Sequence, residues 1–375
     1  MLSLRKPYLL YLGDAVLKSD CKTAFGLRDW CGNDVLGEWS HPDGRVSLDL
    51  ARLTPAQAAQ RGAGSLIVGV APTGGALPDH WQDDLEAALN AGLDVVSGMH
   101  TRLTEFPRLV RAAQRAGTRL IDVRHMNPRF PVATGRKRSG KRVLSVGTDC
   151  ALGKKYTALA LTRALHERGA AATFRPTGQT GIMIAGTGIA VDSLVADFLA
   201  GAAEALSPDN DAAHWDVIEG QGSLFHPAYA AVTLGLLHGS QPDAIILCHA
   251  PERLTIEEYP DYPIPPLDEV IDTYLRAGRL TNRNIRCSGI SINSSQLEEA
   301  AWRDYRARLE ITAAWCKSCD ICVKLCPERC LRLNAERTVE LGDAAKCTGC
   351  RLCEWLCPDF AITVSRVASG ARASS

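Results

Sequence analysis

Eight cysteines near the end of the 375-residue chain stand in two copies of one pattern. The pattern, Cys-x2-Cys-x2-Cys-x3-Cys-Pro, begins at Cys316 and again at Cys347. Thiolates are soft ligands that suit iron–sulfur clusters, and in paired runs of this type the fourth cysteine of each run ligates the cluster of the other run. The spacing therefore predicts two [4Fe–4S] clusters. One is assigned Cys316, Cys319, Cys322 and Cys357, and the other Cys347, Cys350, Cys353 and Cys326.

The cysteine repeat leaves some alternatives open. A pair of four-cysteine zinc sites is the competing interpretation, although two interleaved quartets that end in Cys-Pro disfavour it. Two neighbouring clusters can carry single electrons, or they can serve the structure alone. Cys330 is a spare cysteine, which we expect to be a small buried side chain and not a ligand.

Residues 312–365 resemble bacterial two-cluster ferredoxins, and especially the small ferredoxin-like subunit of 2-oxoacid:ferredoxin oxidoreductases. The segments "WCKSCDICVKLCP" and "KCTGCRLCEWLCPDFAI" carry this resemblance. The resemblance implies an α+β two-cluster ferredoxin domain that transfers electrons. It also implies a redox partner such as a 2-oxoacid oxidoreductase.

A second candidate functional motif is "SVGTDCALGKKYT" at 145–157, which has the features of a phosphate-binding loop. It follows an apolar run, bends at Gly153 and leads into a helical pattern. In such loops the backbone N–H groups point at a phosphate, the helix N-terminus favours its negative charge, and a lysine adds a cation. The residues expected to hold the phosphates are Gly147, Thr148, Asp149, Gly153, Lys154, Lys155 and Thr157.

The loop departs from the nucleotide-hydrolase pattern just after its lysine. The next residue normally supplies a hydroxyl to Mg²⁺, but here it is Lys155, and the nearest hydroxyl belongs to Thr157. Lys155 would place a second cation near the phosphates and partly replace the charge of the metal. We therefore expect the loop to bind a phosphorylated group without magnesium-dependent cleavage. A strand–helix turn without any ligand is the alternative.

Alternating strands and helices must position this loop. Apolar runs at 8–13, 65–70, 94–98 and 119–124, with helical patterns at 83–92 and 105–117, predict a small and mostly parallel sheet. Further runs at 142–147, 215–220, 243–249 and 286–293 alternate with helical patterns at 154–170 and 191–206. The expected fold is α/β. It comprises a Rossmann-like domain (1–135), a P-loop NTPase-like domain with a parallel sheet (142–310), the ferredoxin domain (312–365) and a disordered tail (366–375).

The basic stretch "TGRKRSGKR" at 134–142 lies between the first two domains. Its flanking glycines and serines favour a solvated linker. An arm that contacts phosphates is the alternative.

Several stretches before the cysteines resemble one P-loop family, which is catalogued as a domain of unknown function and includes a D-glutamate N-acetyltransferase. They are "LGDA" (12–15), "GVAPTGG" (69–75), "VVSGMHTRL" (95–103), "GTDCALGKKYT" (147–157), "TGQTGIMIAGTGIAVD" (177–192) and "EGQGSLFHPAY" (219–229). The resemblance spans about residues 5–310. It implies acetyl transfer to a small acidic amino acid. The loop itself is also similar to that of dethiobiotin synthetase-like proteins, which read GTD-x3-GK.

Acyl transfer to an amine needs a base for the ammonium, a donor for the oxyanion and cations for the substrate carboxylates. Glu219, His226 and His100 are the candidates for catalysis, because each follows a predicted strand, where α/β proteins bind ligands. A Walker-B-like acidic position is the alternative for Glu219, and a structural role is the alternative for both histidines. The glycine-rich stretch at 177–188 would let the backbone approach a ligand closely, so that Gln179 and Thr180 could bind a polar group of the substrate. A flexible loop is the alternative for this stretch.

Composition limits the partners. The formal net charge is zero and the pI is about 7.1, which predicts neither nucleic acid nor an anionic membrane as a partner. No apolar run is long enough to predict a transmembrane helix. Nine of the 14 cysteines crowd into residues 316–357, which favours metal binding in a reducing compartment. We expect a cytoplasmic protein and leave a homo-oligomer open.

Three functions are consistent with these patterns. The first is an acyl-CoA-dependent N-acyltransferase acting on a D-glutamate-like amino acid, with acetyl-CoA at the P-loop and a fused electron-transfer module. The second is an ATP- and Mg²⁺-dependent ligase of the dethiobiotin synthetase type, with ATP at the P-loop. The third is a ferredoxin-type electron-transfer protein that is gated by nucleotide binding.

Overall fold

The structure, a computed structural model, describes residues 2–71, 74–295, 308–343, 346–347, 352–355, 357 and 361–365. The chain divides into two units. The first comprises Met1–His249 and Thr255–Ser291, and the second comprises Ala250–Leu254 and Ile292–Ser375. The first unit contains two five-stranded sheets, a two-stranded hairpin and the P-loop, whereas the second contains the cysteine repeat.

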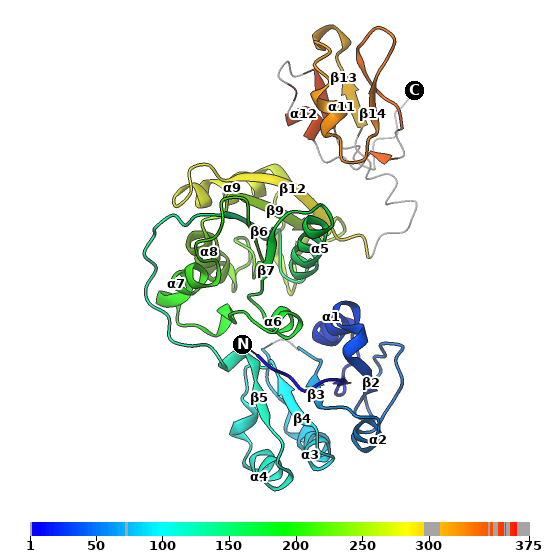
Figure 1. Cartoon of the computed structure of the whole chain (residues 1–375), viewed down its shortest axis with the longest axis vertical. Helices are drawn as coiled ribbons and strands as arrows, with labels where there is room; N and C mark the ends of the chain where they lie inside the picture. Colours follow the sequence, from blue (N-terminus) through cyan, green and yellow to red (C-terminus); the bar gives the residue numbers. More distant parts are fainter. Residues whose placement is uncertain are drawn as a thin grey trace. The chain divides into compact units, whose positions relative to one another are not determined.

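The first sheet occupies the blue and cyan part of the first unit (Figure 1). Its strands follow the order β2-β1-β3-β4-β5, and each neighbouring pair is parallel. The strands are β1 (Tyr8–Tyr11), β2 (Val35–Trp39), β3 (Ser65–Val68), β4 (Asp94–Ser97) and β5 (Leu120–Asp122). The helices are α1 (Lys22–Trp30), α2 (Pro55–Gln60), α3 (Gln82–Asn90) and α4 (Pro107–Ala116). The predicted parallel sheet is confirmed, with β2 as an additional strand.

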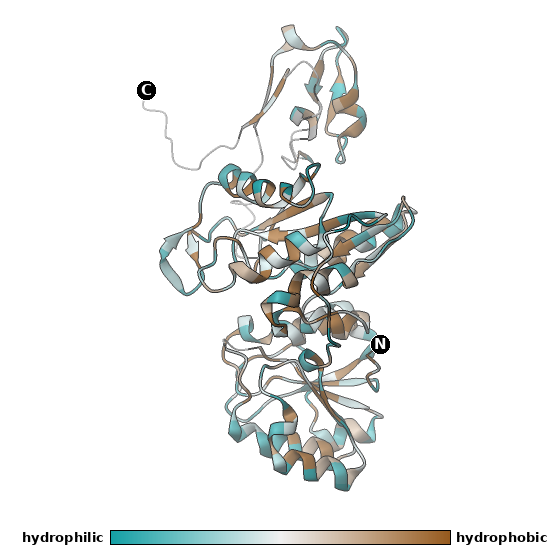
Figure 2. Cartoon of the chain, turned by 90° about the vertical axis from the view of Figure 1, so that its left-hand side faces the viewer, coloured by the Kyte–Doolittle hydropathy of each residue, from teal (hydrophilic) through white to brown (hydrophobic). Residues whose placement is uncertain are grey.

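Apolar burial explains why these segments are strands. Every residue of β1, β3 and β4 is buried, as expected for parallel strands that are covered on both faces. Figure 2 shows helices that carry both brown and teal residues, as expected for helices that bury one face. Local signals set the helix ends: Thr54 and Gln57 form a capping box at the start of α2, and Gly117 ends α4 with a left-handed φ of 65°.

The second sheet has the order β12-β9-β6-β8-β7, and the pairs β6–β8, β6–β9 and β7–β8 are parallel. Its strands are β6 (Lys141–Gly147), β7 (Ala172–Arg175), β8 (Trp215–Ile218), β9 (Ala244–His249) and β12 (Arg286–Ile292). The helices are α5 (Lys154–Glu167), α6 (Gln179–Ala185), α7 (Ala196–Leu206), α8 (Ala230–Ser240) and α9 (Leu267–Arg279). A hairpin, β10 (Thr255–Ile256) and β11 (Tyr259–Pro263), precedes α9. Within the described residues, no helix has the length and apolar content to cross a membrane.

Helix α6 joins the two sheets. It follows β7 of the second sheet, yet Ile182 and Met183 are buried in the hydrophobic core of the first sheet. Near its end, Leu2 N donates to Gly186 O at 2.8 Å. The strand ends of the second sheet are therefore held against the first sheet by α6.

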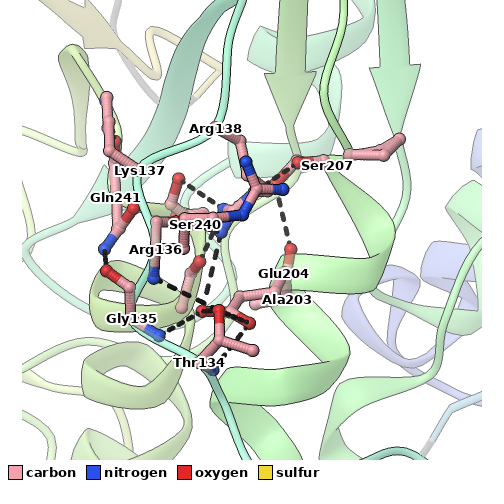
Figure 3. A network of polar contacts seen from close by, with 12 residues as sticks. Thr134, Gly135, Arg136, Lys137, Arg138, Ala203, Glu204, Ser207, Ser240 and Gln241 are labelled. Carbon is pink, nitrogen blue, oxygen red and sulfur yellow. Dashed lines mark hydrogen bonds and ion pairs between the residues drawn. The ribbon is translucent and has the colours of Figure 1, made fainter.

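The basic stretch before β6 is docked onto the second sheet's helices and is not a solvated linker (Figure 3). Arg138 is 6% exposed and Arg142 is 1% exposed. Arg138 donates from Nε to Ser207 O and from Nη2 to Gly239 O, both at 2.7 Å. Burial, followed by the charge of Arg142, lowers the pKa of Arg138 to about 10. Because protein carbonyls satisfy these guanidinium groups, the solvated-linker prediction is wrong for them, and they are not a phosphate arm.

The second unit has short antiparallel ladders. Strand β13 (Arg308–Ile311) pairs with β16 (Ile362–Ser365), and β14 (Leu331–Leu333) pairs with β15 (Val339–Leu341). The short helices α11 (Ile321–Leu325) and α12 (Leu352–Trp355) accompany them. The assignment of this α+β arrangement to a ferredoxin domain stays a prediction. Cys350 and the predicted tail at 366–375 lie outside the described residues.

Candidate active site

The predicted strand–loop–helix is present. Strand β6 ends at Gly147 and helix α5 begins at Lys154. Between them, Ala151 and Gly153 have left-handed φ angles of 53° and 99°, and only glycine adopts the second without strain. Lys154 is buried, and its Nζ donates to Asp149 O at 2.7 Å. The ammonium of Lys154 therefore lies against the loop backbone, as a phosphate-binding lysine requires.

Thr148 and Asp149 shape the loop from inside. Both are buried. The Asp149 carboxylate accepts from Cys150 N at 2.6 Å and from Glu257 N, in the β10–β11 hairpin, at 2.8 Å. Thr148 Oγ1 lies 3.1 Å from His249 Nδ1. These contacts fix the conformation of the loop. Because the side chains of Thr148 and Asp149 are engaged with the protein, the groups suited to bind a phosphate are the loop N–H groups and the Lys154 ammonium.

Thr157 faces the second sheet. Its Oγ1 lies 2.8 Å from Ser291 Oγ and accepts from Cys248 Sγ at 3.3 Å. Both partners come from the strands β9 and β12, on the sheet side of α5. The hydroxyl is thus held by the sheet, which disfavours a metal contact from Thr157.

Lys155 extends toward helix α1. Its Nζ donates to Lys22 O at 3.4 Å, and a Cβ placed on Gly26 would lie 2.6 Å from this Nζ. Burial lowers the pKa of Lys155 to about 8, against the opposing influence of the Glu219 charge. The Lys155 ammonium therefore lies beside α1 and interacts through its charge with Glu219.

Glu219 follows β8 and is 4% exposed. Its Oε2 accepts from Thr177 N at 3.0 Å and from Gly178 N at 3.2 Å. Burial raises the pKa of Glu219 to about 7, although Lys155 and these two N–H groups act in the opposite direction. Glu219, which is buried, and Lys155, which is half-buried, thus interact through their charges. Both pKa values move toward neutrality, which is typical of proton-transfer sites.

Gln179 and Thr180 begin α6, so the predicted flexible-loop alternative is wrong for this part of the glycine-rich stretch. Thr180 Oγ1 lies 2.9 Å from Thr23 Oγ1, and Gln179 Nε2 donates to Thr23 Oγ1 at 3.3 Å. Gln179 Oε1 is buried and has no hydrogen-bond partner within the described residues. This acceptor suits an N–H donor of a ligand.

His226 is buried close to the P-loop. Its Nδ1 accepts from Ala228 N at 3.1 Å, so the neutral ring carries its proton on Nε2. Burial lowers the pKa of His226, which favours that neutral ring. His226 therefore presents a donor, and the base interpretation is disfavoured.

Ligand atoms of Asp149, Cys150 and His226 lie within 4.8 Å of one another near the P-loop, and this spacing suggests a metal site. The hydrogen bonds argue against it. The Asp149 oxygens accept backbone N–H groups, and a ring whose Nδ1 accepts a hydrogen bond has a proton on Nε2 instead of a lone pair. The geometry fits a hydrogen-bonded cluster better than a cation.

His100 is an exposed residue that lies three positions after the end of β4. Its backbone N donates to Gly75 O at 2.8 Å, and His125 Nε2 lies 2.8 Å from its carbonyl. Partial burial of the ring, followed by the charge of Arg124, lowers the pKa of His100. Across the part of the chain that the structure describes, no hydrogen bond joins His100, Glu219 and His226 to one another. Glu219 interacts instead with the charge of Lys155.

Sequence reasoning missed the contribution of α1. Thr23, Lys22 and Gly26 contact the polar residues of α6 and α5, although no motif marked them. Their signal is weak, because single threonines and glycines in a helical segment carry no pattern. Only the docking of α1 against α6 brings them to the site.

The cysteines of the first predicted quartet lie near one another. Burial and then the neighbouring thiols Cys319, Cys316 and Cys357 raise the pKa of Cys322 to about 11. Such grouping is what a single cluster would need from its four ligands. The assignment of a [4Fe–4S] cluster to this quartet stays a prediction.

Two cysteines of the second predicted quartet, Cys326 and Cys347, lie near the spare cysteine Cys330. Cys330 is 3% exposed, so its predicted burial is confirmed. Its Sγ lies 3.3 Å from Cys326 Sγ, and burial together with Cys326 and Cys347 raises its pKa. Cys353 is partly buried in the same core. Cys330 therefore lies beside two predicted ligands of one cluster.

Two family models match the chain. Residues 131–320 match a domain of unknown function, DUF1611_C, described as a P-loop domain. Residues 39–126 match DUF1611_N, described as a Rossmann-like domain. The two domain types and their order agree with the sequence prediction. Residues 321–375, with most of the cysteine repeat, lie outside both matched ranges.

Curated relatives cover most of the chain. A D-glutamate N-acetyltransferase of Tritonibacter scottomollicae is 47% identical over 293 residues, which is 78% of this chain and 88% of the relative. A D-glutamate N-acetyltransferase of a Pseudoalteromonas species is 43% identical over 311 residues, or 83% of this chain and 94% of the relative. A crystal structure of a DUF1611 family protein from Anabaena variabilis ATCC 29413 matches with a TM-score of 0.72 and 33% identity, over 80% of this chain and 91% of that chain.

Proposed function

The chain belongs to the DUF1611 family, and on this premise we propose that it is an acyl-CoA-dependent N-acyltransferase acting on a small acidic amino acid such as D-glutamate. The names of the two curated relatives support acetyl transfer. The observation in the structure that carries the proposal is the buried Glu219 and its charge interaction with Lys155. It places a carboxylate with a pKa of about 7 beside a cation.

The reaction requires one proton acceptor. The substrate ammonium loses a proton to Glu219, and the amine then attacks the thioester carbonyl. A C–N bond forms, the C–S bond breaks, and the leaving thiolate takes up a proton. A base with a pKa near the working pH is efficient because it is largely ionised and still accepts a proton readily. The raised pKa of Glu219 meets this requirement.

The other residues of the site would bind coenzyme A and orient the amino-acid substrate. The loop backbone from Gly147 to Gly153 and the Lys154 ammonium would hold the phosphates of coenzyme A. Lys155 would pair with a substrate carboxylate, and Gln179 Oε1 would accept from the substrate ammonium. The His226 Nε2–H is a donor for a ligand oxygen on the P-loop side.

Further candidate residues have supporting roles. Thr180, which is held by Thr23, would position Gln179. His100 follows β4 and would border the site from the first sheet. Thr157 would hold α5 against the sheet instead of contacting the phosphates.

The second unit would be a two-cluster electron-transfer module. When bound, [4Fe–4S] clusters supply one-electron chemistry, and the grouped thiols of Cys316, Cys319, Cys322 and Cys357 support the first ligand set. The anaerobically purified chain should contain about eight irons and acid-labile sulfides. It should also give reduced-cluster signals in electron paramagnetic resonance after dithionite. A colourless protein without iron would overturn this part of the proposal.

The second candidate function is an ATP-dependent ligase, because Glu219 follows a strand of the P-loop sheet as a Walker-B-like acid does. One comparison separates the two functions. The protein is incubated with acetyl-CoA plus D-glutamate, and separately with ATP plus Mg²⁺. Free thiol without ADP is expected, whereas ADP without thiol would refute the transferase. Electron transfer to a 2-oxoacid oxidoreductase, with neither product, would favour the nucleotide-gated ferredoxin.

Lys154→Ala is the matched variant for this comparison. It removes the loop ammonium that donates to Asp149 O, so thiol release should fall to background. Iron content should not change, because Lys154 belongs to the first unit and the cysteine repeat to the second.

A further inference from the structure

Four aromatic rings form a contact series beside the P-loop. The ring centroids of Tyr229 and His226 are 4.5 Å apart, those of His226 and Tyr259 5.2 Å, and those of Tyr259 and Tyr262 6.0 Å. Tyr229 and His226 belong to the segment between β8 and α8, whereas Tyr259 and Tyr262 belong to β11 of the hairpin. We call these four residues the aromatic wall.

The aromatic wall is attached to the phosphate loop. At its centre, a ring nitrogen of His226 lies within 4.8 Å of side-chain ligand atoms of Asp149 and Cys150. The hairpin is tied to the same place, since Glu257 N donates to the Asp149 carboxylate at 2.8 Å. The wall therefore begins at the loop and continues outward along the hairpin.

The two ends of the wall are open to solvent. Tyr229 is 47% exposed and Tyr262 is 50% exposed, whereas His226 is 3% exposed. The contacts of Tyr259 with His226 and Tyr262 are edge-on, at interplanar angles of 76° and 88°. Edge-on packing leaves ring faces available for stacking. The centre of the wall is fixed while its outer rings present accessible π-surface.

A phosphate loop recognises phosphates alone, because its ligand contacts are backbone N–H groups and a lysine. Recognition of the rest of a nucleotide has to come from neighbouring groups. We propose that the aromatic wall binds the heteroaromatic base of the nucleotide moiety whose phosphates the P-loop holds. The inference rests on the proposed phosphate site and adds the group and residues that recognise the base.

The test compares a nucleotide with its phosphates alone. The full-length protein is titrated calorimetrically with ADP and with inorganic pyrophosphate. The wild type should bind ADP roughly tenfold or more tightly than pyrophosphate, the effect expected of one stacked base. Because one base stacks at one end of the wall, at least one of Tyr262→Ala and Tyr229→Ala should weaken ADP binding by roughly fivefold or more, and both should leave pyrophosphate binding unchanged.

Two controls accompany these variants. Tyr262→Phe keeps the ring and should keep the ADP affinity of the wild type. Phe198→Ala removes an exposed aromatic of α7, which makes none of the wall's ring contacts, and should change neither affinity.

Unchanged ADP affinity in both alanine variants would overturn the inference, as would a wild type that binds ADP no more tightly than pyrophosphate. If the wild type binds neither compound, the phosphate site itself is absent and the inference falls with it. The pyrophosphate titration therefore distinguishes failure of the wall from failure of the proposed function.

Discussion

Glu219 shows how burial and hydrogen bonding set a residue's chemistry. Burial penalises its charged form, while Thr177 N, Gly178 N and the Lys155 ammonium favour it. Burial is the larger influence, so the pKa rises to about 7. The opposing contacts keep the carboxylate from being neutral throughout the physiological range. The residue can therefore both accept and release a proton near pH 7.

Replacement of Glu219 tests its role as the base. Glu219→Gln retains an oxygen that accepts from Thr177 N and Gly178 N, but it has no proton-accepting carboxylate. We expect kcat for thiol release to fall by about 10²- to 10⁴-fold, with little change in the KM for acetyl-CoA. Glu167→Gln, at the exposed end of α5, is the matched control. Equal kcat values for the wild type and Glu219→Gln would contradict the assignment.

Lys155 should tune this base. Its charge lowers the pKa of Glu219, so removal of the charge in Lys155→Met should raise that pKa further. The rising limb of the kcat–pH profile should then move to higher pH. Lys155→Arg, which keeps the cation, should move it less, and Lys22→Met should not move it. A limb at the wild-type position in Lys155→Met would show that Lys155 does not act on Glu219.

Single residues were predicted where a local pattern defines them. Gly153 and Lys154 follow from the loop spacing, and Glu219 from its place after a strand. The direction of Lys155 was not predictable, because it depends on α1, which carries no motif. The hydrogen bond from Ala228 N to His226 Nδ1 could not be predicted from the sequence either. It changes His226 from a candidate base into a hydrogen-bond donor.

At the scale of elements, long apolar runs predicted β1, β3, β4, β6 and β9. The short strand β7, with the sequence "ATFR", has too few apolar residues for such a pattern. Helix α6 was not predicted, because the glycines of the stretch 177–188 indicated a loop. A Cβ at Gly181 would collide with Glu219 Oε2. Gly181 therefore permits the carboxylate to approach α6, which explains a glycine inside this helix.

The segment before β6 gives a prediction about stability. Arg138→Met removes the Arg138 donors from Ser207 O and Gly239 O. Ser207 O keeps Arg142 as a donor, whereas Gly239 O loses the hydrogen bond from the guanidinium. The free energy of unfolding should fall by about 3 kcal/mol, as measured by urea denaturation. Arg136→Met is the control, since the Arg136–Asp209 ion pair lies on the surface. Equal midpoints for the two variants would indicate that the buried contacts contribute nothing.

At the scale of the whole molecule, the chain combines a family architecture with a separate cysteine-rich unit. The family match ends at residue 320, and the second unit begins at residue 292 apart from a short earlier segment. The class of the first unit was predictable because strands and helices alternate regularly. The arrangement of the two sheets was not, since it depends on α6 crossing into the core of the first sheet.

Cluster content tests the interleaved ligand assignment in the second unit. Cys316→Ser removes one predicted ligand of a single cluster, so iron content should fall by about half while thiol release stays near the wild-type rate. Cys287→Ser, which lies in β12 outside the repeat, should keep its iron. Full iron content in Cys316→Ser would contradict the assignment of this ligand.

The pH dependence of thiol release tests the central claim most directly. With saturating acetyl-CoA and D-glutamate, kcat should rise with pH and level off above a pKa of about 7, because only the ionised Glu219 carboxylate accepts the substrate proton. Glu219→Gln should lack this limb. A wild-type rate that is constant between about pH 5.5 and 8.5, or a limb that persists in Glu219→Gln, would show that another group takes the proton.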